Sequence, residues 1–578
     1  MNSHAKQPPE EGGTPLPGGL PVLDRPAFPA ATIARHRRSG HWPGQTLYQL
    51  LAARAVEMPD RTLLVDRAGR LSYAQTLTAT QRLASGLAAA GIGAGDIVAV
   101  QLPNWREFPL LEYALSLLGA VCVPLPQIYR ERELRLMLGL VQPRAMVIPD
   151  IFRGHDHRAM LAGLRPGLPG LQSVFVVGDP GDAGRPFGDL LQAGQPMPPV
   201  ATDPDTVTEI VFTSGTTGEP KGVMHTANTN FCPPLALAAD HGLGADDVVL
   251  MASTFGHQTG FVYGGQLPLL IGGAVVLMER WDADAALRLI DREKVTFCMG
   301  ATPFLQDLVD AVGPAGGAAS LRAFLCSGAP IPRVLLDRAR DRLGCTVSTG
   351  WGMTEVGLVT LTGLAEAPER AAESDGAPLP GNEVRILDDA GGEVPPGEEG
   401  DLVCRCPSMF AGYYLRPEVT AAGFTADGWF RTGDRARQSA DGHIRITGRS
   451  KDIIIRGGEN IPVVEVEEVL HRHPAILRAA VVAVPDPRFQ EKACAAVQLH
   501  PGGAFDFAEM RRHLEGQRLA RQYHPEYLLV LDDFPLTPSG KVQKFLLRDR
   551  VVERLRDLGE LPAATEDTRP AAQAGRHA

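Results

Sequence analysis

Short apolar runs rich in β-branched residues alternate with helical segments through most of this chain, and no other feature constrains the fold as strongly. From about Thr46, TLYQLLAARAVEMP and WREFPLLEYALSLLGA place apolar residues at helical spacing, whereas GDIVAVQLP, VCVPLP, AMVIPD, SVFVVGD and TEIVFTSG are strand-like. Glycine, proline and aspartate bound the strand-like runs. The pattern predicts an α/β fold with layers built on a largely parallel sheet.

The sequence changes character near Asp427, where DGWFRTGDRARQSADGHIRITGRSKD consists of short, polar strands separated by glycines. An amphipathic helix, IPVVEVEEVLHRHP, and a strand, AILRAAVVAVPD, follow. A chain of 578 residues exceeds the usual span of one domain. We therefore predict a large N-terminal domain over residues 31–448, a smaller α+β domain over residues 449–550, and flexible tails over residues 1–30 and 551–578.

The composition excludes several classes of protein. The net charge is −11 and the isoelectric point is near 5.8, so nucleic acid is not an expected partner. The eight cysteines make no disulfide framework, and the one close pair, Cys404 and Cys406, is interpreted as core thiols in a reduced, cytoplasmic setting. The N-terminus lacks an apolar signal region. The run LPLLIGGAVVLM is too short to span a membrane and is expected to be a buried strand and turn.

The stretch VFTSGTTGEPKGVMHT, from Val211 to Thr226, is predicted to bind phosphate. Glycines let backbone N–H groups approach an anion, hydroxyl groups donate hydrogen bonds, and Lys221 supplies positive charge. The preceding strand would present this loop at a sheet edge, where ligands bind in α/β folds. The stretch does not follow the Walker A pattern, and on composition alone a plain surface loop is the alternative.

Five motifs in a fixed order carry a resemblance to a known family. TSGTTGEPKG begins at Thr213, GWGMTE at Gly350, DGWFRTGD at Asp427, GRSKDIIIRGGENIPVVEVE at Gly448 and PLTPSGKVQK at Pro535. They resemble the phosphate, adenine, ribose, hinge and C-terminal lysine motifs of the adenylate-forming superfamily, which includes acyl-CoA synthetases, adenylation domains of peptide synthetases, and luciferases. The resemblance implies that a carboxylate attacks the α-phosphate of ATP and expels pyrophosphate, after which a thiol takes the acyl group and releases AMP.

The resemblance also implies roles for residues around ATP and Mg²⁺. Thr354 would hydrogen-bond the α-phosphate, and the Glu355 carboxylate would bind Mg²⁺ together with phosphate oxygens. Asp434 would accept hydrogen bonds from both ribose hydroxyls, with support from Arg449. Trp351 stands where the family usually has tyrosine, so stacking on adenine is kept and the phenol hydroxyl is lost. The other implied nucleotide-site residues are Thr213, Ser214, Gly215, Thr216, Thr217 and Lys221 around the phosphates, and Ser327, Gly328, Ala329, Pro330, Gly350, Gly352 and Met353 around adenine. The first four of the adenine group, SGAP, would also line the acyl pocket.

The smaller domain is implied to be mobile between the two half-reactions. Lys541 would reach the large domain during adenylation and bridge the attacking carboxylate and the α-phosphate. Lys451 matches the hinge of this rotation, which would withdraw Lys541 and bring Gly457 and Gly458 to the pocket. Glycines suit a narrow tunnel that the pantetheine arm of CoA must enter.

The stretch ASTFGHQTGFVYGG, from residue 252 to 265, occupies the position that shapes the acyl pocket, and His257, Gln258, Thr259 and Gly260 are its candidate lining residues. The absence of a charged residue here implies an apolar acyl group. This stretch and MGATPFLQDLVD resemble CoA ligases for short- and medium-chain fatty acids and for cyclohexanecarboxylate. Aryl-acid ligases for 2-hydroxylated benzoates usually carry Asn where Gln258 stands, which weakens that alternative and leaves a plain aromatic acid open.

The motifs leave the acceptor thiol open. CoA and the phosphopantetheine arm of a carrier protein present the same thiol, so carrier-protein loading is the alternative to CoA ligation. A non-catalytic nucleotide-binding protein is a distant third interpretation, against which the intact Lys541, Glu355 and Asp434 argue. The expected partners are a carboxylic acid, ATP and CoA, and the chain is expected to be a monomer or a homodimer.

Overall fold

The computed structural model of this protein confirms an α/β architecture with a large and a small compact unit. It describes residues 23, 25–192, 195–214, 220–312, 317–327, 331, 333–366, 368–449, 454–456, 459–486, 489–517, 519, 521–537 and 540–561. The first unit ends at Ile446 and the second begins at Thr447. This division lies close to the expected boundary at residues 448–449, whereas the bounds predicted for the two domains and the tails stay predictions.

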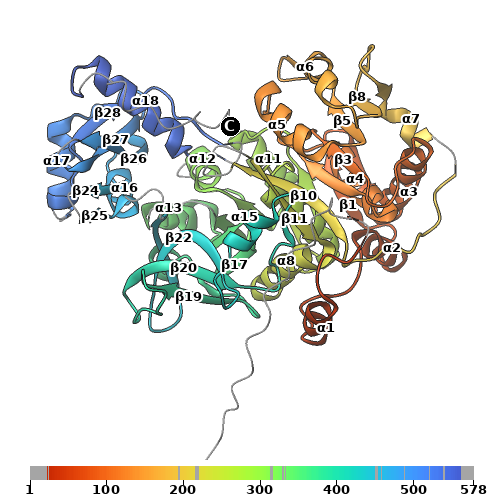
Figure 1. The fold of residues 1–578 in the computed structure, drawn as a ribbon, viewed down its shortest axis with the longest axis horizontal. Helices are drawn as coiled ribbons and strands as arrows, with labels where there is room; N and C mark the ends of the chain where they lie inside the picture. Colours follow the sequence, from red (N-terminus) through yellow and green to blue (C-terminus); the bar gives the residue numbers. More distant parts are fainter. Residues whose placement is uncertain are drawn as a thin grey trace, which may run out of the picture. The chain divides into compact units, whose positions relative to one another are not determined.

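Helices between two large sheets form the centre of the first unit (Figure 1). One hydrophobic cluster joins both sheets to the inner helices, and two further clusters join the outer face of each sheet to the outer helices. The inner helices are α2 (Leu47–Glu57), α3 (Tyr73–Ala89), α4 (Glu107–Leu118), α8 (Ala227–His241) and α10 (Leu267–Ile271). The outer helices are α5 (Glu131–Val141), α6 (His157–Leu164), α11 (Ala283–Glu293), α12 (Thr302–Val312) and α13 (Arg333–Leu343). The remaining helices of this unit are α1 (Ala30–Arg38), α7 (Phe187–Gln192), α9 (Gln258–Gly260), α14 (Pro368–Glu373) and α15 (Pro417–Ala422).

One large sheet has eight strands in the order β21-β11-β10-β4-β3-β5-β8-β9. Pairing is parallel from β10 to β9 and antiparallel from β10 through β11 to β21. All five strand-like runs recognised in the sequence lie in this sheet, as β3, β4, β5, β8 and β10, so these predictions are confirmed. The bounds are β3 (Ile97–Val100), β4 (Val121–Pro124), β5 (Ala145–Pro149), β8 (Ser173–Val177), β9 (Arg185–Pro186), β10 (Val207–Ser214), β11 (Pro220–Thr226) and β21 (Gly412–Tyr413).

The other large sheet has nine strands in the order β18-β17-β16-β15-β14-β12-β13-β1-β2. Its central strands, from β16 to β1, pair in parallel, and only its two edges are antiparallel. The bounds are β1 (Thr62–Asp66), β2 (Gly69–Ser72), β12 (Val248–Met251), β13 (Ala274–Leu277), β14 (Phe297–Gly300), β15 (Ala323–Ser327), β16 (Thr346–Met353), β17 (Gly357–Leu361) and β18 (Ala377–Pro378). The carboxyl ends of the parallel strands therefore lie along one edge, where ligands bind in such folds.

Only the second half of LPLLIGGAVVLM is a strand. Residues Leu267–Ile271 form α10, Gly272 ends this helix with φ of 75°, and Ala274–Leu277 form β13. The expected buried strand and a glycine turn are present, but the helix in the first half was not predicted, because an uninterrupted apolar run has no period that distinguishes a buried helix from a buried strand.

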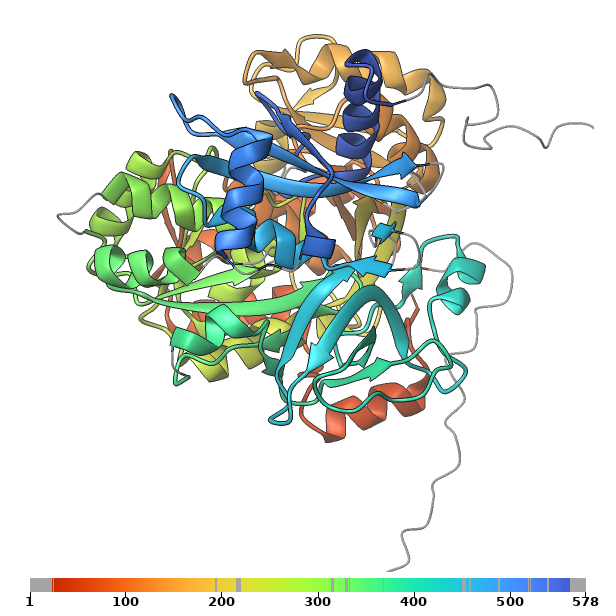
Figure 2. The same cartoon turned by 90° about the vertical axis from the view of Figure 1, so that its left-hand side faces the viewer.

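A third sheet has four strands in the order β19-β20-β22-β23 (Figure 2). β22 and β23 are the polar, glycine-punctuated strands expected near Asp427, and β19 and β20 come earlier in the chain. Cys404 and Cys406 are buried free thiols at the end of β20, which confirms them as core residues. The bounds are β19 (Glu383–Leu387), β20 (Glu399–Arg405), β22 (Phe430–Gln438) and β23 (Ile444–Arg449), and a separate short hairpin pairs β6 (Ile151–Phe152) with β7 (His155–Asp156).

The second unit has one sheet with helices on both faces. Successive residues of its longest strand point to opposite faces, so Val481 packs with α16 and α17 while Val482 packs with α18. The amphipathic helix and the strand predicted for this unit are confirmed as α16 and β26. The bounds are β24 (Ile454–Arg456), β25 (Glu459–Ile461), α16 (Val463–His471), β26 (Ile476–Asp486), β27 (Gln490–Leu499), α17 (Phe507–Gly516), β28 (Tyr527–Val530) and α18 (Lys544–Asp557).

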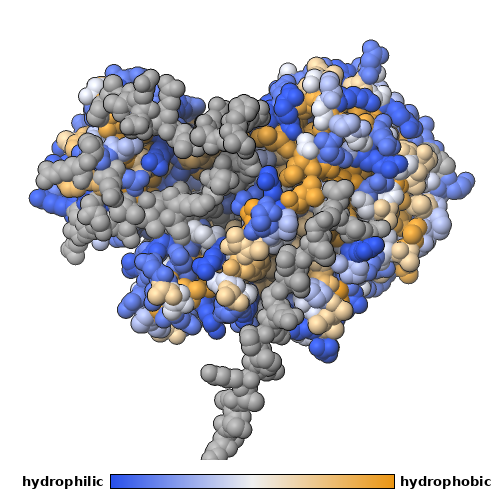
Figure 3. Space-filling model, viewed as in Figure 1, coloured by the Kyte–Doolittle hydropathy of each residue, from blue (hydrophilic) through white to orange (hydrophobic). Residues whose placement is uncertain are grey.

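Hydrophilic residues cover most of the visible described surface, and apolar residues gather on the first unit around α5 (Figure 3). Leu136 of α5 is exposed, whereas Leu134 and Leu138 of the same helix are buried against the sheet. Among the residues that the structure describes, no helix has the length and apolar character needed to cross a membrane.

Candidate active site

The eight-, nine- and four-stranded sheets of the first unit meet in one hydrophobic cluster, and this cluster includes residues of the nucleotide motifs or their neighbours. The cluster contains Val211 from β10, Trp351 from β16, and Cys404 and Phe430 from the four-stranded sheet. The strands that contain Val211, Trp351 and Phe430 carry the phosphate, adenine and ribose motifs, respectively. The strand of Cys404 pairs with the strand of Phe430. Burial of apolar side chains between the sheets therefore brings together segments that are more than 200 residues apart in the sequence.

The phosphate motif begins and ends on an antiparallel hairpin. Thr213 of β10 lies opposite Lys221 of β11, and Ser214 lies opposite Pro220. The Lys221 ammonium nitrogen lies 4.9 Å from the centre of the Tyr413 ring, within the range of a cation–π contact. Three predicted phosphate-loop residues, Gly215, Thr216 and Thr217, lie outside the described residues.

Glu355 is a buried carboxylate, 5% exposed, that follows the strand of the adenine motif. The Tyr413 hydroxyl donates a hydrogen bond of 2.8 Å to Oε1 of Glu355. Burial, and secondly the charge of Glu355, raises the pKa of Tyr413, so this hydroxyl keeps its proton and remains a donor. Lys221, Tyr413 and Glu355 thus form a contact chain that links the phosphate hairpin to the predicted magnesium ligand.

The backbone at Thr354 is held by a buried histidine of the phosphate hairpin. Nε2 of His225 lies 2.7 Å from the carbonyl oxygen of Thr354. A carbonyl oxygen can only accept, so Nε2 carries the proton. Burial lowers the pKa of His225 to about 4, which keeps the imidazole neutral near pH 7. The histidine therefore has a structural role, because it holds the backbone that precedes Glu355.

The predicted adenine and ribose residues lie in contact. Ser327, at the end of β15, lies opposite Gly350 of β16. The indole N–H of Trp351 donates a hydrogen bond of 2.8 Å to Oδ2 of Asp434 in β22. Both side chains are buried, with 8% of Trp351 and 7% of Asp434 exposed.

Other residues implied for this region are less fully described. Met353 ends β16 and is partly buried against the hydrophobic cluster. Arg449 ends β23, but only its backbone is described. Gly328, Ala329 and Pro330 lie outside the described residues.

Two glycines of the GWGMTE motif are required by packing within the sheet. A Cβ atom at Gly350 would lie 2.6 Å from Cδ1 of Leu358, and one at Gly352 would lie 2.2 Å from the carbonyl oxygen of Gly357. Both neighbours belong to β17, the antiparallel partner of β16. These glycines therefore permit the close approach of β17, whatever contact they also make with a nucleotide.

The four candidate acyl-pocket residues lie together at α9. The imidazole Nδ1 of His257 accepts a hydrogen bond from the backbone N–H of Thr259, which caps this helix. A Cβ atom at Gly260 would lie 2.1 Å from the carbonyl oxygen of Thr254, so this glycine is required by the tight turn. The next turn, η2 (Phe261–Gln266), is a π-helix, an irregularity that is frequent at functional sites.

Gln258 connects this segment to the strand of the phosphate hairpin. Its amide nitrogen donates a hydrogen bond of 2.9 Å to the Asn230 side-chain oxygen, and the Asn230 amide donates one of 2.8 Å to Oε2 of Glu209. Glu209 lies on β10, four residues before Thr213. The chain of hydrogen bonds couples the predicted acyl pocket to the predicted phosphate site.

We expect Glu209 to make the stability of this protein depend on pH. Burial raises the pKa of Glu209 from its ordinary value of 4.5 to about 8. Between these values the folded protein holds a proton that the unfolded chain releases, so the free energy of unfolding falls as pH rises from about 4.5 to about 8. In Glu209→Gln this loss is absent. The melting temperature of the variant minus that of the wild type should therefore become more positive, by about 2 °C or more, between pH 5 and pH 8 in thermal melts. A difference that is constant over this range would contradict the raised pKa.

In the second unit, Lys541 is presented by a short, hydrogen-bonded turn. The backbone N–H of Thr537 donates to the carbonyl of Lys541 at 2.7 Å, and the backbone N–H of Lys541 donates to the Thr537 hydroxyl at 3.0 Å. Gly540 adopts a φ of 83°, which a glycine reaches without strain. The hinge residue Lys451 and the tunnel residues Gly457 and Gly458 lie outside the described residues.

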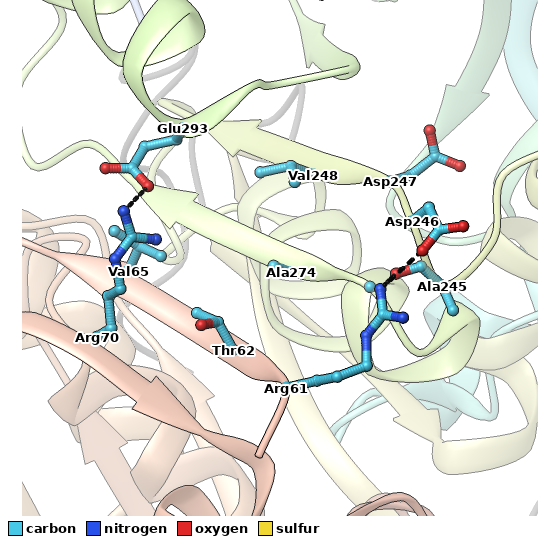
Figure 4. Close-up of a pocket in the computed structure, with 11 residues that line it drawn as sticks. Arg61, Thr62, Val65, Arg70, Ala245, Asp246, Asp247, Val248, Ala274 and Glu293 are labelled. Carbon is cyan, nitrogen blue, oxygen red and sulfur yellow. Dashed lines mark hydrogen bonds and ion pairs between the residues drawn. The ribbon is translucent and has the colours of Figure 1, made fainter. Parts of the chain in front are cut away.

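A separate cavity of about 200 Å³ opens at the opposite edge of the nine-stranded sheet (Figure 4). It is lined by the first residues of β12 and β13, Val248 and Ala274, so it lies at the amino ends of the parallel strands. Four of its charged side chains pair with one another, Arg70 with Glu293 and Arg61 with Asp246. This cavity contains none of the residues implied for the nucleotide, and it is not the candidate active site.

Sequence reasoning missed Tyr413, Asn230 and Glu209. None of them belongs to the five motifs, and neither tyrosine of YYLRPE lies at a spacing that indicates a ligand. Glu209 is a charged residue within the otherwise apolar strand TEIVF. A charged residue is rarely buried without a partner, so its position in this strand could have indicated a buried polar contact.

Comparison with known proteins agrees with this arrangement. Residues 51–414 match the AMP-binding enzyme family, and residues 465–541 match the C-terminal domain of AMP-binding enzymes. The chain is 36% identical over 529 residues to Medium-chain fatty-acid–CoA ligase of Escherichia coli, a match that covers 90% of this chain and 93% of that protein. It is 33% identical over 558 residues to Salicyl-AMP ligase / salicyl-S-ArCP synthetase of Mycobacterium tuberculosis, which covers 93% of this chain and 95% of that protein.

Solved structures show the same fold. ATP-bound MatB from Rhodopseudomonas palustris is similar with a TM-score of 0.80 and 28% sequence identity, over 88% of this chain and 100% of that chain. The family match extends over more than half of the chain and includes both the hairpin of the phosphate motif and Glu355. The chain therefore belongs to the AMP-binding family of adenylate-forming enzymes.

Proposed function

We propose that this protein activates a medium-chain or alicyclic carboxylic acid as its acyl adenylate and transfers the acyl group to CoA. The observation that carries the proposal is the joining of Lys221, Tyr413 and Glu355 in one contact chain, with Trp351 and Asp434 in the same hydrophobic cluster. This arrangement offers a cation, a buried carboxylate and a carboxylate acceptor to a nucleotide. The similarity to a medium-chain fatty-acid–CoA ligase supports the choice of acid.

Two anions must meet in the first half-reaction, so cations and directed donors supply most of the rate enhancement. Lys221 and the hydroxyl groups of the phosphate hairpin hold the β- and γ-phosphates while pyrophosphate leaves. Thr354, whose backbone is fixed by His225, donates to the α-phosphate. Lys541 bridges the attacking carboxylate and the α-phosphate, and no covalent bond to the protein is needed.

The residues present suit a magnesium ion. In the part of the chain that the structure describes, no group of three or more His, Cys, Asp or Glu is arranged to hold a metal. Mg²⁺ bound with ATP needs only one or two carboxylates in addition to phosphate oxygens, and Glu355 is a carboxylate next to the phosphate hairpin. When bound, Mg²⁺ supplies positive charge that neutralises the developing negative charge on the phosphates.

In the second half-reaction the smaller domain rotates about Lys451 and brings Gly457 and Gly458 to the acyl adenylate. The thiol of CoA then attacks the acyl carbon and AMP leaves. Loading of a carrier protein is the second candidate, and the similarity to a salicyl-AMP ligase / salicyl-S-ArCP synthetase favours it.

A substrate panel tests the proposal and distinguishes these candidates. Pyrophosphate exchange should be measured with saturated acids from butyrate to dodecanoate, cyclohexanecarboxylate, benzoate and salicylate. We expect a medium-chain or alicyclic acid to exceed salicylate by at least about tenfold in exchange rate, because each methylene that fits an apolar pocket strengthens binding. AMP release should then follow addition of CoA. Release only with a phosphopantetheinylated carrier protein would favour the second candidate, and no exchange with any acid would refute both.

A further inference from the structure

The indole of Trp351 contacts the carboxylate predicted to hold the ribose. Its N–H donates to Oδ2 of Asp434 at 2.8 Å, although the two residues lie on strands of different sheets. The ring is held by the hydrophobic cluster in which it is buried. A hydrogen bond to a charged group is stronger than one between neutral groups, so this contact fixes the carboxylate more firmly than packing alone would.

The Asp434 backbone is held separately from its side chain. Its N–H donates to the Thr432 hydroxyl at 3.0 Å, and that hydroxyl donates to the carbonyl of Leu402 at 2.7 Å. β22 therefore places the Cα atom of Asp434, and side-chain contacts, the indole N–H among them, set the rotation of the carboxylate about its side-chain bonds.

We propose that Trp351 is a positioning residue for the ribose: its N–H orients the Asp434 carboxylate so that other lone pairs of the carboxylate receive the 2′- and 3′-hydroxyls of ATP. An ionised carboxylate has about four lone-pair positions, and the indole uses one of them. This inference rests on the proposed function. It gives the indole a second role in addition to stacking on adenine, one that a phenylalanine ring cannot supply.

The test measures how strongly the enzyme distinguishes ATP from nucleotides that lack one ribose hydroxyl. KM values for ATP, 2′-deoxy-ATP and 3′-deoxy-ATP should be measured by pyrophosphate exchange, with the best acid of the panel, for wild type and Trp351→Phe. We expect KM for ATP to rise roughly tenfold in Trp351→Phe and KM for the deoxynucleotides to rise much less, because the misoriented carboxylate loses the ribose contacts. The preference for ATP over each deoxynucleotide should therefore shrink.

Trp281→Phe is the matched control. The indole of Trp281 donates a hydrogen bond of 2.7 Å to an aspartate, Asp307, outside the nucleotide motifs, so the same substitution there should leave all three KM values unchanged. Site-specific replacement of Trp351 by benzothienylalanine keeps the ring shape and removes only the N–H. This variant should show the same changes in KM, and it replaces Trp351→Phe in the test if the latter folds poorly.

Equal increases in KM for all three nucleotides in both Trp351 variants would overturn the inference, since they would indicate stacking alone. Asp434→Asn separates this failure from failure of the proposed function. If Asp434→Asn alters the ribose preference while the Trp351 variants do not, the positioning role is wrong and the ribose site stands. If Asp434→Asn leaves the preference unchanged, the ribose assignment itself is wrong.

Discussion

Replacing Lys541 by alanine should abolish formation of acyl adenylate while largely sparing thioester formation from acyl adenylate that is supplied ready-made. In the first half-reaction, a carboxylate approaches the α-phosphate, and removal of the one cation that would bridge them leaves the repulsion uncompensated. We expect the rate of pyrophosphate exchange to fall by at least about 1,000-fold. In the proposed second half-reaction the attacking thiol meets an acyl carbon, and the rotated domain would no longer present this lysine.

The rates of the two half-reactions can be measured separately on one enzyme preparation. Exchange of labelled pyrophosphate into ATP reports the first step, and CoA-dependent AMP release from synthetic acyl-AMP reports the second. Lys544→Ala is the control, because Lys544 lies three residues further on and its ammonium nitrogen pairs with Glu467 at 2.7 Å within the same unit. This control should keep both activities within about threefold, since a partly exposed ion pair contributes little. Equal losses in both steps for Lys541→Ala would contradict separate roles for the two domain orientations.

Replacing Glu355 by glutamine should have the next largest effect. Glutamine keeps the shape of the side chain and an oxygen that can accept from Tyr413, but it removes the negative charge proposed to attract Mg²⁺. We expect the rate of acyl adenylate formation to fall about 100-fold or more at low millimolar Mg²⁺, with partial recovery as the Mg²⁺ concentration is raised. Titration of exchange activity against free Mg²⁺ measures both effects.

Tyr413→Phe provides the comparison for this variant. It removes the hydrogen bond to Glu355 and keeps the charge and the aromatic ring beneath Lys221. In the Tyr413 variant the rate of acyl adenylate formation should therefore fall by about tenfold or less, and its dependence on the Mg²⁺ concentration should be unchanged. If Glu355→Gln showed the same Mg²⁺ dependence as the wild type, the assignment of Glu355 as the metal ligand would be wrong.

The fold was largely predictable because its strands are short, apolar and clearly bounded. β3, β4, β5, β8 and β10 each occur where glycine, proline or aspartate interrupts a β-branched run. The run LPLLIGGAVVLM was the exception, since a fully buried segment carries no amphipathic period and its helical half could not be told from a strand.

The contacts of the site could be predicted only in part. The family resemblance implies that Glu355 and Asp434 serve one nucleotide, but it does not reveal that Tyr413 donates to the first or that Trp351 donates to the second. Tyr413 of the eight-stranded sheet contacts the turn between β16 and β17, and Trp351 and Asp434 lie on strands of two different sheets. The geometry of both pairs is set by packing among these sheets. Side-chain contacts of this kind depend on the tertiary structure and leave no periodic pattern in the sequence.

The glycines of the GWGMTE motif affect how mutagenesis here must be interpreted. An alanine at Gly352 would push the following hairpin strand away, and with it the segment that leads from Trp351 to Glu355. Loss of activity in an alanine variant at this position could therefore result from displaced backbone alone. A crystal structure or a thermal melt of the variant would be needed before the loss could be attributed to a direct effect on nucleotide binding.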